Sequence, residues 1–542
     1  MNMSRLTCLF VCVLSCCTAQ AGELTVFPMF TDHGILQQDT TVAIWGTAKP
    51  GSTVSVTFHE ASSKATANPS GKWLARLQTP KAIPGHFDGY DLTISDASES
   101  IVLHDVALGE VWIGGGQSNM ETPMHRYAVG TAEIPLADHP GIRLYSRGGR
   151  DIDGDFSKFK WERCSPEVVK NASATGYFFS RDLHQKLNVP VGFVNMAVGG
   201  SPLSAWVKPD WLMADSRTAA YLEAFRATTF PAFIEDRIAR LAKWEAMVAE
   251  AKAKGEKPNP SWPPVRGAAD QPLEAFIGAL HVTNTAMVMP FVFKGMIWDQ
   301  GESGVGYRLK GSYDIIFDIM LQHLREGFGY DLPMVYCQMP KGGAWGPKQH
   351  VLVTESAFSE QGDELVPLAD LPPKPPKAGP VFDGFAKESE TFLRMNALPN
   401  CVMATTRDLV AALHPPDKDD YAARFLRVAL NQVYGKNVEF FGPMITSAKR
   451  EGDQIRVSFN YAGSGLTVPS VKPLQGFYIT AADGTSTWVS GQVNGNQVIL
   501  RGPGIETAQT LSYAHTNGGR VLWANLFNLE GLPAYPMTVT IQ

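Results

Sequence analysis

Residues 109–120, GEVWIGGGQSNM, join an apolar run to three successive glycines and a serine. An apolar run that ends in glycines is typical of a buried strand followed by a tight turn. We therefore predict a strand that places Ser118 on an exposed strand-to-helix turn, where the glycines let a substrate approach closely. There its hydroxyl can act as a nucleophile and its N–H can bind an oxyanion. The alternative is that Ser118 only caps a helix, a position that serine often occupies.

Two later segments repeat this scheme. Residues 189–200, VPVGFVNMAVGG, and residues 292–303, VFKGMIWDQGES, are apolar runs that also lead into glycines. The N–H groups of Gly199 and Gly200 could bind a negative oxygen, although a plain tight turn has the same sequence. The Gln300 amide could donate to an oxyanion, or it could be a buried polar group that satisfies the loop backbone.

Helices are predicted between these strands. Residues 174–187, 380–395 and 419–434 carry apolar residues at helical spacing, and residues 333–340 form a further apolar run. Apolar strands that alternate with helices indicate a parallel sheet with helices on both faces. In such a sheet the site lies beyond the carboxyl ends of the strands, so we expect the glycine-rich strand ends to form it.

The sequence pattern divides the chain into three parts. Residues 22–107 and 436–542 contain short runs of alternating apolar and polar residues, which are typical of β-sandwich strands buried on one face. The α/β domain is predicted over residues 108–435, with insertions near 207–275 and 341–380. The insertions either wall a substrate cleft or form solvated surface.

A base is required, because a serine hydroxyl is a weak nucleophile until its proton is removed. His414 lies in the segment ALHPPDK, residues 412–418, which is a loop ahead of the last predicted helix. The two prolines stiffen the chain behind the ring. We predict that His414 is this base, and the alternative is an ordinary loop histidine.

Composition and charge limit the location and the partners. The 542 residues carry a net charge of −6, and 44% are hydrophobic, which disfavours nucleic acid as a partner. Residues 1–21 have one arginine, an apolar run and small residues at a cleavage spacing, so they are predicted to be a signal peptide. A lipoprotein signal at Cys16 is the alternative. No later run reaches about 18 apolar residues, so we expect a secreted or periplasmic protein without a membrane span.

Cofactor sites are not indicated by the sequence. Three cysteines follow the predicted signal peptide, namely Cys164, Cys337 and Cys401, and their spacing matches no metal site. The glycines at 114–116 lack the Lys-Ser/Thr of a phosphate-binding loop. One disulfide among the three cysteines stays open, as does the oligomeric state.

Four motifs, in the order GEVWIGGGQSNM, NMAVGGSPLSAW, GMIWDQGES and LHPPDK, resemble those of the sialate O-acetylesterase family of SGNH-type serine esterases. The resemblance extends from residues 27–39 to residues 527–536, and so covers nearly all of the chain outside the insertions. It implies a flavodoxin-like SGNH hydrolase domain between β-sandwich domains. It also implies ester hydrolysis on an acetylated carbohydrate, without metal or cofactor.

The same resemblance implies roles for individual residues. Ser118 would attack the acetyl carbonyl, and His414 would take its proton and later give it to the leaving alcohol. The oxyanion hole would combine the N–H groups of Ser118 and of Gly199 or Gly200 with the Gln300 amide. The residues that would shape the site around them are Gln117, Asn119, Trp298 and Glu302.

The chain departs from the family pattern in two places. The family usually has an aspartate shortly before the histidine, where this chain has Ala411 and Ala412. Asp408 could orient His414 if the loop folds back, or another carboxylate or a backbone carbonyl could do so. Asp299 stands where the family usually has an aromatic residue. An added negative charge near the site would disfavour anionic substrates, so a neutral acetylated glycan fits at least as well as sialic acid.

The function expected from the sequence is therefore that of a secreted serine esterase that removes O-acetyl groups from a carbohydrate. Two other functions stay open. The first is a glycan-binding protein that kept the fold and lost catalysis. The second is an esterase for a longer acyl chain.

Overall fold

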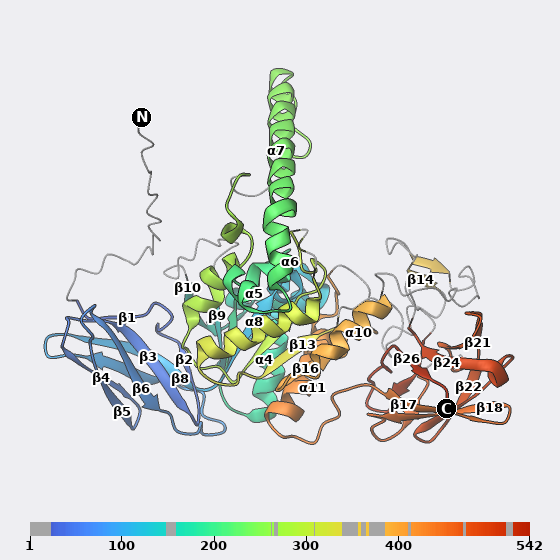
Figure 1. The fold of residues 1–542 in the computed structure, drawn as a ribbon. Helices are drawn as coiled ribbons and strands as arrows, with labels where there is room; N and C mark the ends of the chain where they lie inside the picture. Colours follow the sequence, from blue (N-terminus) through green and yellow to red (C-terminus); the bar gives the residue numbers. More distant parts are fainter. Residues whose placement is uncertain are drawn as a thin grey trace.

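The computed structural model describes residues 23–147, 159–261, 263–264, 269–307, 309, 311–338, 356–358, 365–367, 385–409, 414–469, 473–515 and 524–542. N-terminal β-sheets, a central α/β region and C-terminal β-sheets follow one another across the molecule (Figure 1). The predicted signal peptide, the lipoprotein alternative at Cys16 and most of the insertion at 341–380 lie outside the described residues. None of the described helices is both long and apolar enough to span a bilayer.

The central sheet has the strand order β10-β9-β11-β8-β12-β13-β16. Its neighbouring strands are parallel, except for the antiparallel edge pair β10 and β9. The strand bounds are β8 Ser100–Gly116, β9 His139–Arg147, β10 Phe159–Cys164, β11 Val191–Asn195, β12 Gly295–Asp299, β13 Met334–Cys337 and β16 Cys401–Ala404. The predicted α/β class is confirmed, with an antiparallel edge strand that the sequence pattern did not predict.

Side chains of the central strands alternate between two apolar clusters. Trp112 and Ile297 belong to the cluster that includes α4 and α11, whereas Val111 and Met296 belong to the cluster that includes α8 and α10. Successive side chains of a strand point to opposite faces, so helices cover both faces of this sheet. The helix bounds are α4 Ala174–Leu187, α8 Tyr313–Phe328, α10 Phe385–Met395 and α11 Lys418–Val428.

Helix α4 has the bounds that its sequence predicts, and its ends show the reason. The Ser173 side chain accepts the N–H of Gly176 at the start, and Asn188 adopts a left-handed conformation at the end. Both are common ways to satisfy helix termini. The helices predicted at 380–395 and 419–434 are also present, as α10 and as α11 followed by a short π-helix, Ala429–Val433.

The N-terminal strands are continuous with the central sheet. Strands β1, β3 and β6 form one sheet, while β5, β4 and β7 pair in sequence up to the first part of β8. Because β8 then continues into the central sheet, the predicted boundary at 107–108 falls within one strand. The bounds are β1 Thr25–Val26, β2 Ile35–Gln37, β3 Thr41–Thr47, β4 Thr53–Phe58, β5 Ala61–Thr66, β6 Lys72–Gln78 and β7 Tyr90–Ser95.

The C-terminal region contains two four-stranded antiparallel sheets, with the orders β17-β18-β23-β22 and β21-β20-β24-β26. Buried residues of both sheets, such as Val457 and Leu511, belong to one apolar cluster. The strand bounds are β17 Met444–Glu451, β18 Gln454–Asn460, β20 Phe477–Ala481, β21 Ser486–Trp488, β22 Ser490–Asn494, β23 Gln497–Arg501, β24 Ala508–Tyr513 and β26 Met537–Thr540.

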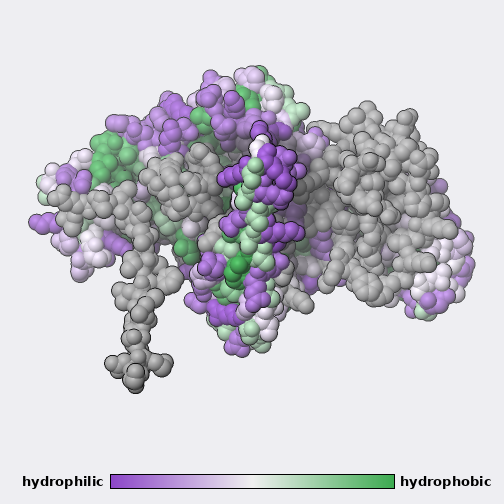
Figure 2. Space-filling model, turned by 90° about the horizontal axis from the view of Figure 1, so that it is seen from above, coloured by the Kyte–Doolittle hydropathy of each residue, from purple (hydrophilic) through white to green (hydrophobic). Residues whose placement is uncertain are grey.

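The first insertion forms a projecting arm. It contains α5 Pro209–Ala214, α6 Ala219–Ala224 and α7 Phe230–Ala253, and α7 extends away from the central region (Figure 1). Of its 24 residues only Phe233, Arg237 and Ala251 are buried, so this helix is mostly solvated surface. Seen from above, the described surface is largely hydrophilic with smaller hydrophobic areas (Figure 2).

The three cysteines are buried and free. The disulfide that the sequence left open is therefore absent from the structure. Among the described residues, no cluster of three or more His, Cys, Asp or Glu side chains could hold a metal ion.

Candidate active site

The carboxyl ends of β8 and β12 lie side by side, and the loop after β11 joins them. Asp299 pairs with Gly116 in the parallel ladder. The Gln117 N–H donates to the Asp299 carbonyl at 2.7 Å, and the Val198 N–H donates to the Gly116 carbonyl at 3.0 Å. The three glycine-rich segments thus converge at one edge of the sheet.

Gly116 is the residue that lets the chain turn out of β8. Its φ is +107°, and a Cβ at this position would lie 2.0 Å from the carbonyl oxygen of Asp299. Both the backbone conformation and the space therefore require glycine. The turn leads directly into α1, Ser118–Glu121.

Ser118 is the first residue of α1, and Gln117 is its N-cap. The alternative in which Ser118 serves as the cap is therefore wrong. The serine is half-buried, and its Oγ makes no hydrogen bond to a described residue. Gly199 lies next to it, because a Cβ on this glycine would be 3.5 Å from the Ser118 Cβ.

The Gly199–Gly200 turn presents one occupied and one open donor. The Gly199 N–H donates to Glu121 Oε2 at 2.8 Å, so a carboxylate of α1 already uses it. Gly200 is exposed and has a φ of +74°. Within the described part of the chain, neither its N–H nor that of Ser118 donates to an acceptor.

The Gln300 amide is buried and holds the loops together. Its Nε2 donates to the Gly304 carbonyl at 3.0 Å and to the Ser201 carbonyl at 3.3 Å. Its Oε1 accepts from the Tyr313 hydroxyl at 2.5 Å. In this structure the amide satisfies loop backbone, which matches the alternative to an oxyanion-hole role.

The residues beside Ser118 are bridged by Glu302. The Gln117 Nε2 donates to Glu302 Oε2 at 2.5 Å, and the Asn119 Nδ2 donates to Glu302 Oε1 at 2.9 Å. Trp298 is buried against Trp206, with ring centroids 5.3 Å apart. Gln117, Asn119 and Glu302 thus shape the serine turn directly, whereas Trp298 supports it from the core.

His414 lies in the loop that leads into α11, and its Nε2 atom is buried. Lys418, the first residue of α11, donates from its ammonium to Asn119 Oδ1 at 2.8 Å. Asn119 follows Ser118 directly in the sequence, so this bond brings the histidine segment to the serine turn. Ala411 and Ala412 lie outside the described residues.

Asp408, the proposed partner of His414, is engaged elsewhere. Its side chain is fully buried, and its two oxygens accept from the Arg424 guanidinium at 3.0 and 2.7 Å. A bidentate ion pair of this kind fixes the relative orientation of the carboxylate and the guanidinium. The observed geometry therefore favours a structural role for Asp408.

Asp299 is buried rather than exposed to the substrate. Its Oδ2 accepts from the Tyr421 hydroxyl at 2.9 Å, and its Oδ1 lies 3.5 Å from the Cys337 thiol. Burial raises the pKa of Asp299, and the nearby Lys418 charge acts in the opposite direction. The inference that Asp299 disfavours anionic substrates is therefore wrong, because its carboxyl lies inside the protein beside a cation.

Sequence reasoning gave Lys418 no role, although it belongs to the LHPPDK motif. A lysine in the first turn opposes the positive end of the helix dipole, and that mismatch is a signal that could have identified it. The ammonium is fully buried, and burial lowers its pKa to about 8.

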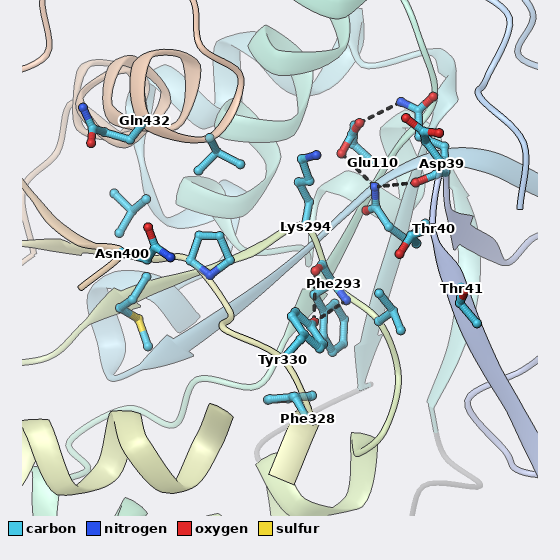
Figure 3. A pocket seen from close by; sticks show the side chains of 18 of the residues that line it. Asp39, Thr40, Thr41, Glu110, Phe293, Lys294, Phe328, Tyr330, Asn400 and Gln432 are labelled. Atoms are coloured by element: carbon cyan, nitrogen blue, oxygen red, sulfur yellow. Dashed lines mark hydrogen bonds between the residues drawn. The ribbon is translucent and has the colours of Figure 1, made fainter. Parts of the chain in front are cut away.

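A separate cavity of about 710 Å³ lies at the opposite edge of the sheet. It is lined by residues at the amino ends of central strands, including Glu110, Lys294 and Asn400. Figure 3 shows Lys294 between Glu110 on one side and Asn400 and Gln432 on the other. Since Ser118 lies at the carboxyl ends, this cavity is not the candidate active site.

Comparison with known proteins agrees with the motifs. No family model matches the chain. Sialate O-acetylesterases from Pongo abelii and Homo sapiens are each 25% identical over 438 residues, which is 76% of this chain and 71% of theirs. The chain is similar to the sialate O-acetylesterases over most of its length. Three of the four motifs that carry this resemblance, those of Ser118, Gly199 and Gln300, are the strand ends that converge.

The fold is also shared with a solved structure. A carbohydrate acetylesterase from Xanthomonas citri superposes with a TM-score of 0.69 at 23% identity, covering 95% of this chain and 99% of that protein. This likeness concerns the fold, and it extends over the N-terminal, central and C-terminal regions alike.

Proposed function

We propose that this protein, like the sialate O-acetylesterases it resembles, removes O-acetyl groups from a carbohydrate, with Ser118 as the nucleophile. The observation that carries the proposal is the convergence of the Ser118 turn, the Gly199–Gly200 turn and the His414 segment at one edge of the sheet. The sialate O-acetylesterases and the carbohydrate acetylesterase to which the chain is similar support the substrate class.

In the first half of the reaction, the Ser118 Oγ attacks the acetyl carbonyl carbon while His414 accepts the hydroxyl proton. The carbonyl electron pair moves onto oxygen, and the oxyanion accepts hydrogen bonds from the N–H groups of Ser118 and Gly200. The bond from carbon to the sugar oxygen then breaks. The sugar oxygen takes the proton from His414, which leaves an acetyl-serine.

In the second half, a water molecule replaces the sugar. His414 accepts a proton from this water, and the resulting hydroxide attacks the acetyl carbon. The same N–H groups stabilise the second oxyanion, and the bond to the Ser118 Oγ breaks as His414 returns the proton. Acetate leaves and the free enzyme is restored.

Replacing Asp408 by asparagine is expected to affect stability more than catalysis. The change leaves the largely buried Arg424 guanidinium without its counter-charge, so the free energy of unfolding should fall by about 3–5 kcal/mol. Urea unfolding measures this, and the exposed Asp453→Asn variant is the matched control. A loss of kcat near 10⁴-fold at unchanged stability would instead give Asp408 the role of orienting the histidine.

A second candidate function is glycan binding without catalysis. It is favoured by the occupied Gly199 N–H and by the engaged Gln300 amide. Labelling with a fluorophosphonate separates the two functions, because only an activated serine reacts at a measurable rate. Stoichiometric labelling at Ser118 supports the esterase, and absence of labelling in the folded protein supports the binding protein.

We propose a neutral acetylated glycan as the preferred substrate over an acetylated sialic acid. The Glu121 carboxylate lies beside Ser118 through its bond to Gly199, so a sugar carboxylate bound nearby would be repelled. We expect kcat/KM to be about tenfold higher for the neutral ester, equivalent to about 1.4 kcal/mol. The rate of acetate release from each substrate, at low and at high salt, measures this ratio of kcat/KM values.

Salt and a charge variant provide the controls for this preference. The difference in kcat/KM between the neutral ester and the acetylated sialic acid should narrow at high ionic strength, because salt screens the repulsion between solvent-exposed charges. It should also narrow in Glu121→Gln, which removes the charge and keeps the shape of the side chain. Equal rates for both substrates at low salt would refute the preference. The signal peptide predicted at 1–21 supports a periplasmic or extracellular location for this activity.

A further inference from the structure

The proposed reaction needs two segments that are far apart in the sequence to keep one geometry. Ser118 lies on α1, and His414 lies four residues before Lys418, which begins α11. The Lys418 ammonium donates to Asn119 Oδ1 at 2.8 Å and to the Asn119 carbonyl at 3.3 Å. One charged group therefore connects the histidine segment to the residue after the nucleophile.

Asn119 is held from two other directions as well. Its Nδ2 donates to Glu302, in the loop after β12, and the Thr175 hydroxyl of α4 donates to its carbonyl at 2.8 Å. Lys418 is the charged donor in this arrangement and the only one of these groups that lies on the histidine segment. Movement of Lys418 would therefore change the position of His414 relative to Ser118.

The environment of Lys418 supports a buried cation. Its ammonium lies 4.5 Å from the ring centroid of Tyr421 and 5.3 Å from that of Tyr127, and aromatic faces attract cations. The electrostatic effect of Asp299 on β12 favours the charged form of this ammonium. A buried charge costs stability even when it is paired. The presence of the Lys418 ammonium beside the serine turn therefore suggests that it has a functional role.

We propose that Lys418 is a positioning residue, which acts through Asn119 to hold Ser118 and His414 in the geometry for proton transfer. The inference rests on the proposed esterase function, and it adds a residue to which the family comparison assigns no role. It requires the ammonium form, because a neutral amine is a weaker donor to the two Asn119 oxygens.

The charge of Lys418 also predicts a pH effect. The ionisable groups that act on it are Asp299 on β12, Glu302 in the following loop and Cys337 on β13, with the Tyr127 and Tyr421 rings packed against it. Burial lowers the pKa of Lys418 to about 8. The ammonium is therefore present below this pH, and kcat should fall as the pH rises through it.

The first test replaces Lys418 by methionine, which keeps the length of the side chain and removes its charge. We expect kcat for an aryl acetate to fall by about 100-fold with KM little changed, because a small misplacement of catalytic groups has this effect. The alkaline fall in the pH profile should disappear. The exposed Lys436→Met is the matched control and should retain the wild-type profile. A Lys418→Met enzyme with wild-type kcat and profile overturns the proposal.

A second variant keeps the test decisive if Lys418→Met fails to fold. Asp299→Asn removes the negative charge that raises the pKa of Lys418, so the alkaline fall should move to lower pH. A profile that does not move overturns the proposal. Ser118→Ala separates this proposal from the esterase function: if it stays fully active, the esterase mechanism fails. If it is inactive while Lys418→Met is fully active, only the positioning role fails.

Discussion

Replacing Ser118 by alanine is expected to lower kcat for aryl acetate hydrolysis by at least about 10⁴-fold, with little change in KM. The hydroxyl is the group that forms the covalent bond, and substrate binding by the surrounding loops does not depend on it. The turn itself should persist, because its shape is set by Gly116 and by the bond from Gln117 to Asp299. Steady-state kinetics measure the change in kcat and KM, and fluorophosphonate labelling measures the loss of the reactive hydroxyl.

A second serine at the same edge of the sheet provides the control. The Ser201 hydroxyl donates to the Gly116 carbonyl at 3.1 Å and accepts from the Trp206 indole at 3.1 Å. Ser201→Ala therefore loses structural hydrogen bonds, each worth about 1 kcal/mol, and should keep most of its activity. Equal rates for wild type and Ser118→Ala would exclude Ser118 as the nucleophile.

Replacing His414 by asparagine is expected to lower kcat by about 10³–10⁴-fold. The amide cannot accept the serine proton, so both formation and hydrolysis of the acetyl-serine become slow. Fluorophosphonate labelling of Ser118 should slow by a similar factor.

The matched control for this variant is a histidine on helix α8. His323 on α8 stacks on Trp211, with ring centroids 4.3 Å apart, and bonds to Glu326. His323→Asn should leave kcat and the rate of fluorophosphonate labelling at Ser118 unchanged. Wild-type kcat in His414→Asn would assign the base to another group, and the bond from Lys418 to Asn119 would then have no catalytic histidine to position.

Local pattern predicted much of the fold. The apolar spacing of 174–187 predicted α4 at its observed bounds, and strand alternation predicted the buried and exposed positions of β4, whose Val54, Val56 and Phe58 are buried. These features depend on residues close in sequence. The continuation of β8 through the predicted domain boundary depends on its partners, so the pattern did not reveal it.

The hydrogen-bond partners of individual polar groups were less predictable from the sequence. The sequence indicated which residues stand near the strand ends, but it did not indicate their hydrogen-bond partners. Gly199 donates to Glu121, Asp408 pairs with Arg424, and Gln300 accepts from Tyr313. In each of these pairs, a residue that was predicted to be catalytic or to line the oxyanion hole makes a structural hydrogen bond.

The residue types and their order determined the class of fold, the convergence of three strand ends and the choice of Ser118 and His414 as candidates. Those properties follow from hydrophobic periodicity and from the rule that parallel strands present their carboxyl ends at one edge. The tertiary structure alone decided that the Asp299 carboxyl faces inward and that Lys418 reaches Asn119. Such contacts join residues more than a hundred positions apart, so local propensity carries no information about them.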